Sequence, residues 1–226
     1  TPVSMQPLAS DIRTVTGFET IIPPLAGHNT SPRDLLHVEW EDWYATAENM
    51  VGRLQEGYNN VIVVGHSLGA LLGVEAALDQ NLSGLVLLAP SFGFRLEGVP
   101  GFTTLIERGL VSLPVLPWHN RIAAFTHTHE QAGAPEGYHW FPTSALRELL
   151  RLRNHVTDRL ASERLDLPSL VLQAADDMFA DPAATKRYAD KMGSSLRIYR
   201  KGGHLLPLSQ DRQEFVDDVT WFLMHC

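Results

Sequence analysis

The sequence predicts an α/β fold, with a mostly parallel central sheet covered by helices on both of its faces. Short apolar runs alternate with longer segments of helical spacing, which is typical of parallel strands joined by helices. Most of these short runs are apolar throughout, which favours strands that are buried on both faces. The 226 residues are 44% hydrophobic and 19% charged, as expected of one globular domain with room for an insertion.

The elements of the N-terminal part follow from their residue types. Residues Thr20 to Pro23 are interpreted as a short strand. Apolar residues at helical spacing predict a helix from Trp40 to Glu56 that stops at Gly57. Val61 to Val64 are four consecutive β-branched residues, which predicts a strand buried on both faces. A helix from about Leu68 to Asp79 follows.

The C-terminal part repeats this alternation. Leu85 to Leu88 and Leu170 to Leu172 have the composition of buried strands, and Arg197 to Tyr199 is a weaker example. A helix from Gln213 to His225 closes the chain.

The interval 92–141 breaks the alternation, because Gly and Pro are scattered among its apolar residues. Long segments outside the regular elements tend to be lids or binding loops. We therefore interpret 92–141 as an inserted cap and residues 1–91 with 142–226 as the core. The alternative is an ordinary helical excursion that packs its own small core.

Charge and cysteine content exclude several classes of protein. The formal net charge is −8 and no run of Lys or Arg is present, which argues against a nucleic-acid partner. The longest apolar stretches are far shorter than the roughly 20 residues that a membrane-spanning helix requires. Cys226 is the one cysteine and no secretory signal is evident, so we expect a cytoplasmic protein.

The chemistry is carried by the segment Gly65-His66-Ser67-Leu68-Gly69, which lies between a predicted strand and a predicted helix. A G-x-S-x-G match is weak by itself, but this context predicts a sharp strand-to-helix turn with the Ser67 hydroxyl exposed. The flanking glycines are expected to avoid collisions in that turn. The backbone N–H of Leu68, at the helix start, is then directed at an oxyanion forming on the substrate.

A serine hydroxyl needs a base and an acid that orients the base, here expected in the order Ser, Asp/Glu, His. Asp176 and Asp177 follow the strand Leu170 to Leu172, and His204 follows the strand Arg197 to Tyr199. The ends of parallel strands are where catalytic groups gather. His204 is therefore the predicted general base, whereas spacing alone leaves Asp176 and Asp177 equivalent.

The other histidines have simpler interpretations. His66 is expected to point away from Ser67, and His28 is interpreted as a structural loop residue. His127, His129 and His139 could suggest a metal site, but no third ligand has convincing spacing. We therefore expect no metal.

Together these segments resemble the α/β-hydrolase superfamily, and more narrowly the small bacterial carboxylesterases related to monoacylglycerol lipases. The similarity extends over nearly the whole chain. It rests on the strand-to-helix turn Gly65 to Gly69 together with Thr1 to Met5, Pro24 to His28, Trp40 to Trp43, Asp177 with Pro182, and Gly203-His204. The resemblance implies an α/β-hydrolase fold with a small cap. It also implies that the acid five residues before the proline is catalytic, which selects Asp177.

The start of the chain departs from the family pattern. Members of the family carry a strand ending in a His-Gly-aromatic loop just before the segment that resembles Thr1 to Met5, and that loop supplies the second oxyanion donor. We therefore expect that N-terminal strands are missing from this chain, and that the second donor lies upstream of Thr1. Loss of one such donor typically costs about 2.7–4 kcal/mol of transition-state stabilisation.

The sequence thus predicts a serine hydrolase without a cofactor that cleaves carboxylic esters of short-to-medium acyl or monoacylglycerol type. Ser67 is the nucleophile, His204 the base, Asp177 the orienting acid and Leu68 N–H an oxyanion donor. The expected partner is a small ester whose apolar part is bound by residues of the cap: Phe92, Phe94, Leu105, Leu110 and Trp118. Hydrolysis of a C–C bond or an amide on the same groups, and a non-catalytic binding protein, are the alternatives.

Overall fold

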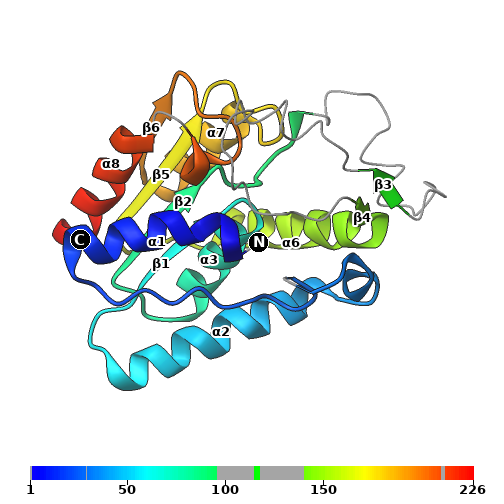
Figure 1. Ribbon diagram of the computed structural model, residues 1–226, viewed down its shortest axis with the longest axis horizontal. Coiled ribbons are helices and arrows are strands. Elements are labelled where there is room, and N and C mark those ends of the chain that lie inside the picture. The colour runs from blue at the N-terminus through cyan, green and yellow to red at the C-terminus, as the bar shows by residue number, and fades with distance from the viewer. Residues whose placement is uncertain (1, 29, 96–114, 118–139, 210–211) are drawn as a thin grey trace.

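A four-stranded parallel sheet with helices on both faces forms the centre of the computed structural model, which describes residues 2–28, 30–95, 115–117, 140–209 and 212–226 (Figure 1). Its strand order is β1-β2-β5-β6. The strands are β1 (Ile62–His66), β2 (Gly84–Leu88), β5 (Ser169–Ala174) and β6 (Ser195–Tyr199). β2 and β5 are buried along their whole length, so the two central strands have the apolar composition that a doubly covered sheet requires.

The register of the sheet brings the ends of these strands together. His66 lies opposite Leu88, Leu88 opposite Leu172, and Leu172 opposite Arg197. Because all the strands are parallel, the loops that follow β1, β2, β5 and β6 leave from the same edge. That edge is where the sequence places its candidate chemistry.

Two hydrophobic cores cover the two faces of the sheet. On one face, α1 (Pro2–Thr16) and α8 (Arg212–His225) pack on Val86, Leu88 and Leu172. On the other face, Leu85, Leu87 and Val171 belong to a core shared by four other helices of the described ranges. These helices are α2 (Trp40–Gly57), α3 (Leu68–Asp79), α6 (Thr143–Ser162) and α7 (Pro182–Met192). Alternate residues along β2 thus point to opposite cores, as the two-residue period of a strand requires.

Most of the predicted elements are confirmed, and within the described residues three helices were missed. α2, α3 and α8 lie where helical spacing places them. β1, β2 and β5 lie on the apolar runs, and β6 includes the weaker candidate Arg197 to Tyr199. The missed helices are α1, α6 and α7. α7 carries a clear signal: the Asp181 carboxylate accepts from the N–H groups of Ala183 and Ala184, Pro182 is the first helical residue, and Gly193 ends the helix at φ 68°. Short 3₁₀ turns lie at Pro32–Leu36 and Leu206–Leu208.

Near the N-terminus one strand prediction is wrong, and a second is confirmed as a strand but not in its burial. Residues Thr20 to Pro23 form no strand; they run back between α1 and α2 without pairing (Figure 1). A groove of about 600 Å³ is lined by this segment and by Ile62 and Val64 of β1, and Thr20 to Pro23 belong to no sheet in the described part of the chain. β1, an edge strand among those described, is only half-buried at Ile62, Val63 and Val64, not buried on both faces.

Most of the predicted cap, residues 96–114 and 118–139, lies outside the part of the chain that the structure describes. Within the interval, β3 (Val115–Pro117) pairs with β4 (Trp140–Pro142) in an antiparallel ribbon. Residues 92–95 lie against the core instead, with an isolated bridge between Phe94 and Ala180. None of the helices in the described ranges has the length and apolar composition to cross a membrane.

Candidate active site

The turn between β1 and α3 holds Ser67 in a strained backbone conformation. Its φ is 55° and its ψ is −113°, which a non-glycine residue rarely adopts. Its backbone N–H donates to the carbonyl oxygen of Leu88 at 2.9 Å, so the turn is attached to the end of β2. A Cβ on Gly65 would lie 2.2 Å from the backbone oxygen of Gly69, so glycine is required at 65. A Cβ on Gly69 would meet nothing within 4 Å, so the expected collision at that position is wrong.

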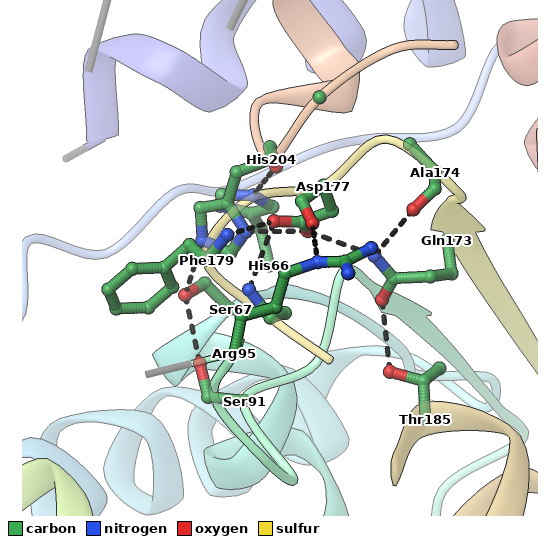
Figure 2. Close-up of polar contacts among 12 residues, drawn as sticks. His66, Ser67, Ser91, Arg95, Gln173, Ala174, Asp177, Phe179, Thr185 and His204 are labelled. Atoms are coloured by element: carbon green, nitrogen blue, oxygen red, sulfur yellow. Dashed lines mark hydrogen bonds and ion pairs between the residues drawn. The ribbon is translucent and has the colours of Figure 1, made fainter. Parts of the chain in front are cut away.

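Three predicted residues form one continuous chain of hydrogen bonds, which Figure 2 shows from Ser67 through His204 to Asp177. His204 Nε2 lies 2.9 Å from Ser67 Oγ, and His204 Nδ1 lies 2.9 Å from Asp177 Oδ2. Asp177 is fully buried, whereas the His204 side chain keeps 14% of its surface exposed. The three side chains come from the loops after β1, β5 and β6, which the parallel sheet brings to one edge.

The Asp177 carboxylate accepts hydrogen bonds at both oxygens. Oδ1 accepts from the backbone N–H groups of Phe179 (2.7 Å) and Ala180 (3.0 Å), and Oδ2 accepts from Gln173 Nε2 (2.9 Å) as well as from His204. Burial raises the pKa of Asp177, but the hydrogen bond and charge of His204 and the donors from Phe179 and Gln173 outweigh it. The pKa therefore lies below its ordinary value, and the carboxylate is ionised at neutral pH.

The neighbouring acid has a different contact. Asp176 Oδ1 accepts the backbone N–H of Gly203 at 2.9 Å. Gly202 and Gly203 have φ angles of 145° and 61°, which favour glycine. Asp176 thus contacts the backbone of the loop that carries His204, and Asp177 contacts the imidazole.

His66, which was expected to point away from Ser67, makes contacts with His204 that the sequence did not indicate. Its ring lies 5.0 Å from the ring of His204, centroid to centroid, and its Nε2 is 2.7 Å from the backbone oxygen of His204. Since a carbonyl only accepts, His66 Nε2 carries the hydrogen. Burial and the nearby His204 lower the pKa of His66 to about 3. His66 is thus a neutral donor that attaches the His204 backbone to the end of β1.

Four further residues at this edge were not identified from the sequence. Ser91 Oγ lies 3.0 Å from Ser67 Oγ. Thr185 donates to Gln173 Oε1 at 3.0 Å, which extends the chain behind Asp177 (Figure 2). The Arg95 guanidinium donates to the backbone oxygens of Asp177 and Ala175. One signal was available, because Gln173 is a polar residue directly after the apolar run Leu170 to Leu172.

The predicted substrate-binding residues are only partly described. Phe92 is buried in the core and stacks on Tyr188, and Phe94 packs edge-on against Phe179. Phe179 in turn lies 4.8 Å from the His204 ring, centroid to centroid. The other predicted pocket residues, Leu105, Leu110 and Trp118, and the histidines His127, His129 and His139 lie outside the described residues.

His28 has a structural contact, as predicted. Its Nδ1 lies 3.1 Å from the Ala26 oxygen, and its ring packs edge-on against Trp43. Burial lowers the pKa of His28. In the ranges that the structure covers, no group of three or more His, Cys, Asp or Glu could hold a metal ion.

Known proteins resemble the chain in sequence. A family model described as the alpha/beta hydrolase family matches residues 4–218. The carboxylesterase of Bacillus subtilis (strain 168) is 22% identical over 216 residues, which cover 92% of this chain and 81% of the relative. The thermostable monoacylglycerol lipase of Bacillus sp. (strain H-257) is 26% identical over 232 residues, which cover 100% of this chain and 87% of the relative.

A solved structure resembles the chain in fold. It comes from work on LipS and LipT, two metagenome-derived lipolytic enzymes, and it has a TM-score of 0.82 at 20% identity. The match covers 100% of this chain and 89% of that chain. Because the family model spans nearly the whole sequence and the sheet has the expected architecture, the chain belongs to the α/β hydrolase family.

Proposed function

We propose that the protein is a serine esterase that hydrolyses carboxylic esters through an acyl-enzyme on Ser67. The observation that carries this proposal is the continuous chain of hydrogen bonds from Ser67 through His204 to the buried Asp177. Each member has the role that its contacts allow. Ser67 is the nucleophile, His204 the general base, and Asp177 the group that orients His204 and stabilises its charged form.

The reaction has two halves. In acylation, Ser67 Oγ attacks the ester carbonyl while His204 Nε2 takes its proton, and the same proton then goes to the leaving alcohol. In deacylation, His204 takes a proton from water, the water oxygen attacks the acyl carbon, and the proton returns to Ser67 Oγ as the acid leaves. The negative charge that Asp177 keeps at neutral pH stabilises the imidazolium in both halves.

The oxyanion that forms in each half needs donors placed in advance. Leu68 is the first residue of α3, so its backbone N–H has no acceptor within the helix and lies at the positive end of the helix dipole. We assign Leu68 N–H as one oxyanion donor.

An apolar acyl group agrees with the surroundings of His204. Phe179 lies against the His204 ring, and Phe94 lies against Phe179, so aromatic surface borders the reacting groups. Each buried methylene contributes about 0.8 kcal/mol, which favours short-to-medium acyl chains without selecting one length sharply. Two relatives of the chain are described as a carboxylesterase and a monoacylglycerol lipase. We infer a small ester or monoacylglycerol-like substrate.

Labelling with a fluorophosphonate tests the nucleophile directly, because the reagent traps an activated serine. We expect one adduct, mapped by peptide mass to Ser67, that is lost in Ser67→Ala and strongly reduced in His204→Ala. Absence of labelling in the folded protein would contradict the proposal and favour a binding protein without turnover.

A substrate panel tests the reaction class. We expect turnover of 4-nitrophenyl esters of two to ten carbons, and Ser67→Ala should abolish it while leaving the circular dichroism spectrum unchanged. A protein that labels at Ser67 but is slow on every ester of the panel would instead be a C–C bond or amide hydrolase.

A further inference from the structure

Ser91 lies beside the nucleophile although it follows a different strand. It is the third residue after β2, it is fully buried, and its Oγ is 3.0 Å from Ser67 Oγ (Figure 2). The chain reaches this position through Ala89, whose φ of 43° is in the left-handed region that non-glycine residues seldom adopt. Backbone strain of this kind costs about 1–3 kcal/mol and is concentrated at functional sites. The strained turn at Ala89 delivers the Ser91 hydroxyl to Ser67.

The direction of the hydrogen bond between the two serines follows from counting hydrogens. Asp177 is an ionised acceptor, so His204 Nδ1 carries the single hydrogen of the neutral imidazole and Nε2 accepts. Ser67 therefore gives its one hydrogen to His204 Nε2. Ser67 Oγ can then only accept from its other neighbour, so the Ser91 O–H donates to Ser67 Oγ.

We propose that Ser91 is a further catalytic residue, whose hydroxyl donates to Ser67 Oγ and promotes its departure from the acyl-enzyme. The inference rests on the acyl-enzyme mechanism proposed above. Ser67, His204 and Asp177 act in both acylation and deacylation. Ser91, by contrast, is assigned a role in deacylation alone.

The chemistry of the two halves differs at Ser67 Oγ. In deacylation, the bond between the acyl carbon and Oγ breaks, Oγ takes the bonding electron pair, and it receives the proton held by His204. A hydrogen bond from Ser91 strengthens as negative charge builds on Oγ and makes it a better leaving group. In acylation, a lone pair of Ser67 Oγ already accepts the hydrogen bond from Ser91 before the attack begins. The same contact therefore does not help Oγ to attack the ester carbonyl. Ser91 keeps its proton throughout.

The two halves can be separated by steady-state kinetics. The ratio kcat/KM depends only on steps up to acylation, whereas kcat with a good leaving group depends on deacylation. Loss of an interaction that helps only deacylation therefore lowers kcat and KM together and leaves kcat/KM unchanged. With 4-nitrophenyl butyrate, we expect Ser91→Ala to lower kcat and KM each about tenfold, the size expected when a hydrogen bond to a group gaining charge is lost.

Two direct measurements accompany these constants. Intact mass spectrometry after rapid acid quench should show butyrylated Ser91→Ala protein accumulating at a level that the wild type does not reach. The rate of fluorophosphonate labelling, which reports attack by Ser67, should stay within about twofold of the wild type. Ser91→Cys keeps a weaker donor of similar size and should fall between the wild type and Ser91→Ala.

The matched control is Ser169→Ala. Ser169 is also buried and also bonds to a second serine, Ser194, at 2.6 Å, but it lies at the opposite end of β5 from Gln173 and Asp177. The Ser169→Ala variant should leave kcat and KM unchanged. A parallel fall of kcat and kcat/KM in Ser91→Ala would overturn the inference, as would no change at all. Failure of the underlying esterase proposal is recognised separately, because the wild type itself would then form no adduct at Ser67.

Discussion

Replacing Gln173 by Met tests whether the groups behind Asp177 hold it in place. Gln173 and Thr185 are fully buried. Gln173 Nε2 donates to Asp177 Oδ2 at 2.9 Å, and its Oε1 accepts from Thr185 at 3.0 Å. Gln173→Met removes a hydrogen bond to a charged group, worth about 1.5–3 kcal/mol, and leaves the Thr185 hydroxyl buried without an acceptor, which costs about 1–3 kcal/mol. We expect the free energy of unfolding to fall by about 2.5–6 kcal/mol, the sum of these two contributions.

The partner variant separates these two contributions. Thr185→Val alone leaves Gln173 Oε1 without a donor and should cost about 1–3 kcal/mol. In Gln173→Met/Thr185→Val no hydroxyl is left unpaired, so the double variant should be more stable than Gln173→Met by about 1–3 kcal/mol.

Urea unfolding at pH 7, followed by circular dichroism, measures all four proteins. Gln6→Met, on an exposed position of α1, is the control and should change stability by less than about 0.5 kcal/mol. Additive losses, with the double variant destabilised by the sum of the single changes, would refute the reasoning, because they would show that Gln173 and Thr185 do not depend on one another.

Three further predictions concern charge. Asp177→Asn should lower kcat by on the order of 10⁴, because the equivalent change in serine proteases leaves the histidine in the wrong tautomer. Asp176→Asn keeps an oxygen that accepts the Gly203 N–H, so it should lower kcat by less than about tenfold. Ester hydrolysis assays compare the two variants. The unfolded chain binds a proton at the ordinary His66 pKa of 6.5 and the folded chain only at about 3, so stability falls as the pH falls below 6.5. His66→Gln should remove about 2 kcal/mol of the loss between pH 7 and pH 5, measured by urea unfolding, and an unchanged slope would contradict a buried neutral His66. Arg159 Nη1 lies 2.7 Å from the buried Glu75. Arg159→Met should lower the free energy of unfolding by about 3–5 kcal/mol, because it leaves the buried Glu75 carboxylate with a weaker partner. The control Lys186→Met breaks an exposed pair with Asp190 and should have little effect on the melting temperature.

Local sequence determined the elements whose stability depends on their own residues. The helix Leu68 to Asp79 and the strands around Leu85 and Leu170 follow from apolar composition and spacing, and the G-x-S-x-G turn places Ser67 between them. The order of Ser67, the acids and His204 along the chain identified the chemistry, because parallel strands bring their ends to one edge whatever lies between them.

Tertiary structure alone decided which groups meet at that edge. Asp176 and Asp177 are neighbours after the same strand, and only the packing of their loop directs one to the Gly203 backbone and the other to the His204 imidazole. Ser91 reaches Ser67 through a backbone turn at Ala89, and the residue types at this turn do not predict it. The prediction of a strand at Thr20 to Pro23 was wrong for the same reason, because a strand forms only where tertiary structure places a partner strand beside it. Hydrogen bonds between distant segments depend on where the folded chain brings their donors and acceptors, and local residue patterns carry no record of that.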